Sequence, residues 1–160
     1  MHFARGADSD VTITCDKKKF EDTAGAASGE NTGVNKKSEN WGYTVSVENE
    51  GFKALTGLEV KYIIFYKHSE LGIKGPPQKK TKTGSYTIDT LAAIGKTTFD
   101  TDPVTLTKAS LGGGAIFGNG ARSRVADTLS GLWIRIYKDG NLFAEYAYPA
   151  GLTSTETWQE

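Results

Sequence analysis

The stretch from Leu129 to Tyr148 constrains the fold most, because it has the pattern of two β-strands joined by a tight turn. Apolar and polar side chains alternate on both sides of Lys138-Asp139-Gly140-Asn141, and alternation around an Asp-Gly pair is a strong hairpin signature. Gly140 can adopt the positive φ that such a turn needs at no steric cost. We therefore expect the remainder of the chain to supply further strands that pack on this hairpin.

The length of the turn decides which side chains share a face, because a slip of one residue moves a whole strand's side chains to the opposite face. A two-residue turn would place Ile134 and Ile136 beside Phe143 and Glu145. A three-residue loop with Gly140 in a bulge separates apolar from polar side chains more cleanly, and we predict this register. Its apolar face would hold Leu132, Ile134, Ile136, Leu142, Ala144 and Tyr146, and its outer face Trp133, Arg135, Tyr137, Phe143 and Glu145.

Length and composition favour one all-β domain over residues 1–160. A chain of 160 residues can bury a sizeable core, and 19 glycines, 7 tyrosines and a single methionine favour strands and turns. The formal net charge is zero, which argues against nucleic acid or an anionic membrane as partner. Cys15 is the single cysteine, so no intrachain disulfide can form, and its place in an alternating run favours a small core residue over a nucleophile.

Alternating segments predict about seven short strands. They begin near Val11, Trp41, Leu58, Ser85, Thr97, Leu132 and Leu142. Pro103 marks a kink or a break in the fifth strand. Residues 16–40 and 109–126 show little apolar periodicity, so we predict long loops there and a core at about residues 41–149. A basic loop is predicted over Ser69–Gly84. The expected architecture is an antiparallel two-sheet β-sandwich, with a jelly roll as the alternative.

Four segments resemble bacterial immunoglobulin-like or fibronectin-III-like domains. They are Gly57 to Lys67, Phe99 to Val104, Leu129 to Asn141, and Glu145-Tyr146, and the resemblance covers roughly residues 41–149. It implies an immunoglobulin-like sandwich from a secreted or cell-envelope protein, of the kind found beside other modules and in pilus or adhesion systems. The inter-sheet disulfide of antibody-type domains is absent, because Cys15 has no partner. Met1–Gly6 lacks the apolar stretch of a signal peptide, so either the protein is cytosolic or its leader is not included in this sequence. The resemblance implies the second alternative, a secreted or cell-envelope protein.

The sequence offers no catalytic motif. Two histidines and one cysteine are too few for a zinc site, and Asp8–Asp10 and Asp100–Asp102 are typical of turn caps rather than of calcium loops. The glycine-rich segment Gly112–Gly120 lacks the Gly-Lys-Ser/Thr of a phosphate-binding loop, and no Gly-x-Ser-x-Gly occurs. We therefore predict no catalytic residue, no metal, no cofactor and no enzymatic activity.

The candidate functional surface is the outer face of the sheet formed by the third, sixth and seventh predicted strands. It gathers apolar and charged side chains that normally mark an interface: Ile63, Phe65, Trp133, Arg135, Tyr137 and Phe143. The alternative is that residues 16–40 or 112–124 fold over this face and cover it. In that case the basic segment Lys74–Lys82 becomes the next candidate.

These observations favour a non-catalytic interaction or assembly module of the cell envelope or the extracellular space. Its partner would be another protein or a second copy of the chain. A carbohydrate-binding module is the alternative, with Trp41, Trp133 and Tyr137 stacking on sugar rings, so a glycan ligand stays open. A hydrolase on a sandwich scaffold would need a pocket with convergent titratable groups. We expect neither nucleic-acid binding nor membrane insertion.

Overall fold

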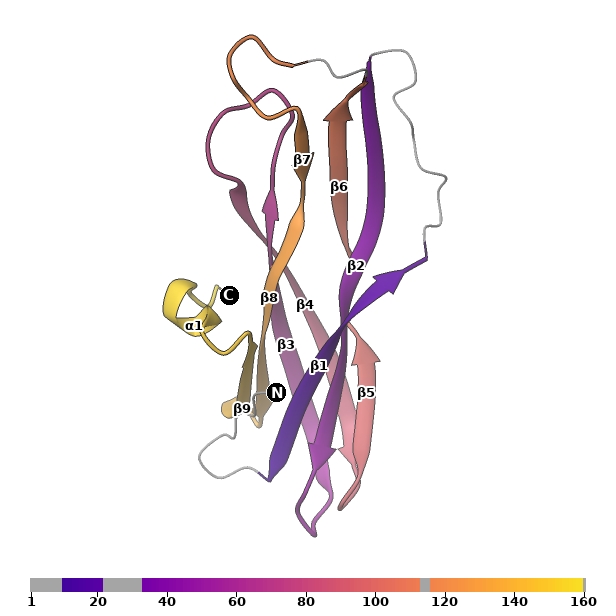
Figure 1. Cartoon of the computed structure of the whole chain (residues 1–160). Coiled ribbons are helices and arrows are strands. Elements are labelled where there is room, and N and C mark those ends of the chain that lie inside the picture. The colour runs from indigo at the N-terminus through magenta and orange to yellow at the C-terminus, as the bar shows by residue number, and fades with distance from the viewer. Residues whose placement is uncertain (1–9, 22–32, 113–115, 160) are drawn as a thin grey trace.

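The computed structural model describes residues 10–21, 33–112 and 116–159. Over these residues the chain forms nine β-strands and one short helix, and the strands build two antiparallel sheets that pack face to face (Figure 1). The predicted all-β, antiparallel two-sheet sandwich is confirmed, and Cys15 is a free thiol. The number of strands is nine rather than about seven, because the fifth predicted strand is two strands and a short one lies in a predicted loop.

The first sheet is organised around β2 (Val34–Asn49), its longest strand. β1 (Val11–Phe20) pairs along one edge of β2, while β5 (Lys96–Asp100) and β6 (Val104–Leu111) follow each other along the other edge. The chain leaves β2 between them at Thr101–Pro103, so Pro103 marks a break rather than a kink. β7 (Arg124–Ala126) pairs with β6 and completes the sheet.

The link between β5 and β6 is anchored to the middle of β2. The backbone N–H of Tyr43 donates to the hydroxyl of Thr101 at 3.0 Å, and the N–H of Thr101 donates to the carbonyl of Tyr43 at 2.9 Å. The link lies so close to β2 that a Cβ at Gly42 would approach the Thr101 hydroxyl to 2.7 Å. A glycine is therefore required at position 42 for this close approach.

The second sheet has the strand order β4-β3-β8-β9. Its members are β3 (Leu55–His68), β4 (Gln78–Leu91), β8 (Thr128–Lys138) and β9 (Asn141–Tyr148), followed by α1 (Leu152–Thr155). β7 and β8 are separated by Asp127 alone, so the chain passes from one sheet to the other at that residue. The space between the sheets is filled by side chains from both, of which the largest fully buried ones are Tyr43, Tyr146, Ile13, Leu58, Ile64, Leu132, Ile134 and Ile136.

The predicted long loops at 16–40 and 109–126 are wrong over much of their length. β1 continues to Phe20 and β2 begins at Val34, while β6 continues to Leu111 and β7 occupies Arg124–Ala126. Val11 and Ile13 are fully buried, so the core also begins before the predicted limit at residue 41. These polar strands are held in the sheet by backbone hydrogen bonds to their neighbours. Such hydrogen bonds do not depend on the side chains, so the sequence shows no apolar periodicity there. Residues 22–32 and 113–115 of the predicted loops lie outside the described residues.

The basic loop predicted over Ser69–Gly84 is only half as long, because β4 begins at Gln78. Lys79, Lys80 and Lys82 lie among other polar residues in the first part of this strand, and their side chains are exposed. β4 has β3 as its one partner and forms an edge of the second sheet. Lysines on such an edge oppose pairing with the strand of another molecule.

The hairpin turn consists of Asp139 and Gly140, with φ angles of 52° and 79°. Lys138 lies opposite Asn141, so the predicted three-residue loop is wrong. The bulge is at Phe143 and not at Gly140. The register shifts there because Phe143 is the extra residue of β9, so Ile136 pairs with Ala144 rather than with Leu142. Ile134, Ile136, Ala144 and Tyr146 share the buried face, as predicted. Leu142, predicted to be internal, is consequently 51% exposed, and Phe143, predicted to face outward, packs against the main core.

This register is tested by a pair of substitutions. Ile134→Asp places a charge in the main core, and we expect loss of cooperative unfolding, since an unpaired buried charge costs several kcal/mol. Leu142→Asp should change the free energy of unfolding by less than about 0.5 kcal/mol. Circular dichroism during urea unfolding measures the stability of both variants. A large loss of stability in the Leu142 variant would show that Leu142 is internal, as the three-residue loop requires.

Candidate functional site

The predicted surface is largely covered by the chain's own C-terminal segment. Ile63, Phe65 and Trp133 are between 1 and 6% exposed and form a second apolar cluster with Leu152 of α1. Trp158 packs edge-on against Trp133, with ring centroids 5.6 Å apart. The cover therefore comes from residues 151–159, whereas the alternative from the sequence assigned it to residues 16–40 or 112–124, which the structure describes only in part.

Polar contacts hold this segment in place at two points. The guanidinium of Arg135 lies 4.6 Å from the ring centroid of Trp158, and Nε of Arg135 also donates to Glu145 at 2.7 Å. Nearer α1, Nζ of Lys79 lies 3.2 Å from a carboxylate oxygen of Glu156. Cation–π contacts of this kind contribute about 0.5–2 kcal/mol, so the segment is bound mainly by the burial of its apolar side chains.

The structure does not bring all six predicted residues together. Phe143 lies on the main core, and Tyr137 is half-buried with Nζ of Lys61 5.3 Å from its ring centroid. Trp41, a candidate for sugar stacking, donates its indole N–H to Glu39 at 2.9 Å. Trp133 has no free ring face for a sugar, because Trp158 and Arg135 contact it. Sequence reasoning missed this cover, although Leu152 and Trp158 in an otherwise polar tail were a signal for it.

Truncation of the Trp158 side chain tests how much the C-terminal segment contributes to stability by covering this face. We expect Trp158→Ala to lower the free energy of unfolding by about 2 kcal/mol, somewhat less than for a fully buried tryptophan, and to increase binding of a dye that reports exposed apolar surface. Tyr137→Ala, on the same face but outside the cluster, should cost about 1 kcal/mol or less. Equal effects of the two substitutions would show that the segment does not cover this face.

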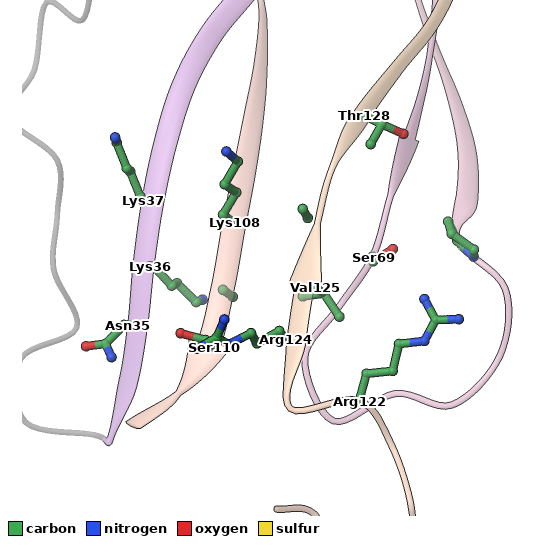
Figure 2. A pocket seen from close by; sticks show the side chains of 13 residues that line it. Asn35, Lys36, Lys37, Ser69, Lys108, Ser110, Arg122, Arg124, Val125 and Thr128 are labelled. Atoms are coloured by element: carbon green, nitrogen blue, oxygen red, sulfur yellow. The ribbon is translucent and has the colours of Figure 1, made fainter. Parts of the chain in front are cut away.

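A second candidate site is a cationic cleft at the end of the sandwich where the β3–β4 and β6–β7 loops lie (Figure 1). It has a volume of about 660 Å³, and Figure 2 shows the side chains that line it, drawn from β2, β6, β7 and the neighbouring loops. Five of them are cations, and none is an acid: the cations are Lys36, Lys37, Lys108, Arg122 and Arg124. This is a strong local excess of positive charge in a chain whose net charge is zero.

The strand register forces like charges together in this cleft. Lys37 of β2 lies directly opposite Lys108 of β6, and two residues further along β6, Ser110 lies opposite Arg124 of β7. Since alternate residues of a strand point to the same face, the register places Lys37, Lys108 and Arg124 on one face. Like charges directly opposite each other on neighbouring strands destabilise a sheet, and a bound anion would remove that cost.

Most of these cations lack a counter-charge. Nζ of Lys37 lies 3.3 Å from Glu39, whereas Lys36, Lys108, Arg122 and Arg124 form no ion pair with any residue that the structure describes. The Trp41 indole, with Lys37 and Lys19, holds the pKa of the Glu39 carboxyl at about 2, well below its usual range. Glu39 is thus fully charged at neutral pH and is already bound by three donors.

A smaller cleft of about 410 Å³ adjoins the first, since Ser69, Arg122 and Val125 line both. It adds Lys74 to the cationic residues, and its one acid, Glu70, lies with Oε1 3.6 Å from Nε2 of His68. The basic segment that the sequence offered as the next candidate therefore contributes Lys74 to this end of the molecule. Lys79 of the same segment instead binds Glu156.

Asp127 fixes the backbone around both clefts. Its carboxylate is buried and accepts hydrogen bonds from the N–H groups of Ser69 and Thr107, each at 3.0 Å, and from Nδ1 of His68 at 2.9 Å. Its own N–H donates to the carbonyl of Thr107 at 3.0 Å. One side chain thus ties the end of β3 to β6 at the point where the chain changes sheets, and the cleft lies beside this junction.

The other side chains that could act as catalytic or metal-binding groups are already hydrogen-bonded or are unreactive at neutral pH. Asp100 binds Nζ of Lys18 at 2.6 Å and the Thr44 hydroxyl at 2.8 Å, and these contacts lower the pKa of its carboxyl. Burial raises the pKa of the Cys15 thiol to about 11, which makes it a poor nucleophile at neutral pH. Among the described residues, no three His, Cys, Asp or Glu side chains lie together in a way that could hold a metal ion.

Comparison with known proteins does not assign the chain to a family. No protein-family model and no curated protein matches the chain. Among solved structures, the X-ray structure of Northeast Structural Genomics Consortium target SoR45 is 10% identical, with a TM-score of 0.43 over 94% of this chain and 96% of that one. A crystal structure from Akkermansia muciniphila is 13% identical, with a TM-score of 0.39 over 100% of this chain and 82% of that one. Both scores are too low to carry an argument.

The role of Asp127 is tested by Asp127→Asn. The amide keeps the size of the side chain but loses its charge and turns a donor toward the N–H groups, so we expect a loss of about 2–3 kcal/mol in the free energy of unfolding. Asp89→Asn, on the exposed part of β4, serves as the control and should change it by less than about 0.5 kcal/mol. Urea unfolding compares the two, and equal stability would show that the junction does not depend on the carboxylate.

Proposed function

We propose that this chain is a non-catalytic binding module, of the secreted or envelope kind that its sequence resembles, and that it binds an anionic ligand in the cationic cleft. The observation that carries the proposal is the set of five cations around one cleft without an acid among its lining residues. The buried Ile63–Trp133 cluster leaves this cleft as the better candidate for a binding surface than the aromatic face.

Electrostatics favours an anion here for two reasons. The cations are exposed, and four of the five form no ion pair within the part of the chain that the structure describes, so a ligand gains their attraction without first breaking such pairs. A concave surface lined by one sign of charge also concentrates counter-ions and speeds the association of charged ligands. Because the site is open to water, its attraction falls as salt is added.

The chemistry of the lining supports binding rather than catalysis. Besides the five cations, the cleft is lined by Asn35, Ser69, Pro77, Ala109, Ser110, Val125, Ala126 and Thr128. None of these side chains is a carboxylate, an imidazole or a thiol, the groups that most often act as general base or activated nucleophile. The hydroxyl and amide groups can donate hydrogen bonds to the oxygens of an anion.

Binding of dextran sulfate, a soluble polyanion, tests this proposal. We expect binding that weakens as sodium chloride is raised, and at least about a tenfold loss of affinity in the double variant Lys108→Glu/Arg124→Glu. Lys53→Glu/Lys96→Glu is the matched control, because it also reverses two charges, on exposed lysines in the β2–β3 loop and at the start of β5, at the opposite end of the molecule. Calorimetry measures all three proteins.

Two results would contradict the proposal. One is no binding of dextran sulfate at low salt, and the other is an equal loss of affinity in the cleft variant and the Lys53/Lys96 control. The charge-reversed side chains are exposed, so thermal unfolding should show that all variants remain folded.

A further inference from the structure

The end of the molecule that holds the cationic cleft also exposes two isoleucines. Ile73, in the β3–β4 loop, is 63% exposed, and Ile116, in the β6–β7 loop, is 83% exposed. Ile73 lines the smaller cleft together with Lys74 and Arg122. Large exposed aliphatic side chains at the same end as clustered cations favour a ligand that carries negative charge and also has an apolar part into which these side chains can be buried.

The described parts of the two loops are bound to each other. Nδ2 of Asn119 donates to the carbonyl of Gly72 at 3.1 Å, and Oδ1 of Asn119 accepts from the N–H of Ala121 at 3.0 Å. Gly72 also lies close against the Phe117 ring, where an added Cβ would come within 3.2 Å of a ring carbon. Ile73 therefore lies on a packed loop beside the cations, and Ile116 belongs to the loop that is bound to it.

We infer that the anionic ligand is the phosphate-bearing headgroup layer of an anionic lipid membrane, with Ile73 and Ile116 entering the boundary between headgroups and acyl chains. Lysine and arginine side chains near an anionic leaflet are attracted to it, and apolar side chains gain by leaving water for the acyl boundary. A soluble polyanion uses the cations but offers nothing to the isoleucines. No helix in the described part of the chain is long and apolar enough to cross a membrane.

This inference rests on the proposed function, and a vesicle experiment separates the two. The full chain is sedimented with phosphatidylcholine vesicles and with vesicles that also contain phosphatidylglycerol. We expect binding only to the anionic vesicles, and at least about a tenfold loss of that binding in Ile73→Asn/Ile116→Asn. Binding of the same double variant to dextran sulfate should equal that of the unaltered protein.

Phe52→Asn is the matched control, because Phe52 is 90% exposed in the β2–β3 loop at the opposite end of the molecule (Figure 1). Its vesicle binding should be unchanged. Binding of dextran sulfate without binding of anionic vesicles would overturn the membrane inference and leave the proposed function standing. Vesicle binding that the isoleucine variant retains would also overturn it, and the failure of both ligands would overturn both proposals.

Discussion

The junction at Asp127 is the constraint on which the cleft end of the structure depends. A strand that changes sheets after a single residue leaves backbone donors of both sheets unsatisfied, and buried N–H groups without partners cost about 1–3 kcal/mol each. The Asp127 carboxylate accepts from Ser69 at the end of β3 and from Thr107 on β6, so it meets this demand in both sheets at once. The separation between the sheets beside it, and hence the width of the cationic cleft, follows from that fixed point.

The two candidate surfaces illustrate how differently apolar and charged residues are treated in folding. The Ile63, Phe65 and Trp133 side chains are covered by the chain itself, because apolar surface gains by leaving water. The five cations of the cleft stay exposed, because burying them without partners would cost far more than it gains. A cluster of exposed like charges, most of them without an ion pair among the described residues, destabilises the fold slightly, and the anionic ligand that we propose would remove this cost.

The sequence predicted the fold class well because side-chain alternation reports half-buried strands, as in β3, β8 and β9. It failed where strands are held by backbone pairing alone: Lys17–Lys19 and Lys36–Ser38 are polar on both faces, so alternation is absent. It also placed Leu142 and Phe143 on the wrong faces, since a bulge leaves no mark in composition. The cleft could not be predicted, because its cations come from segments up to 88 residues apart, all but Lys108 lie in predicted loops, and a net charge of zero conceals their clustering.

The length of β2 has a mechanical consequence. Its sixteen residues extend over about 50 Å at about 3.3 Å each, along nearly the whole long axis of the molecule. A pull between the cleft end and the Phe52 end would run parallel to the strands, so the hydrogen bonds that join β2 to its neighbours would be loaded in shear, many at a time. A module tethered at one end and bound to a surface at the other would therefore resist extension far better than a sheet whose hydrogen bonds are opened one after another.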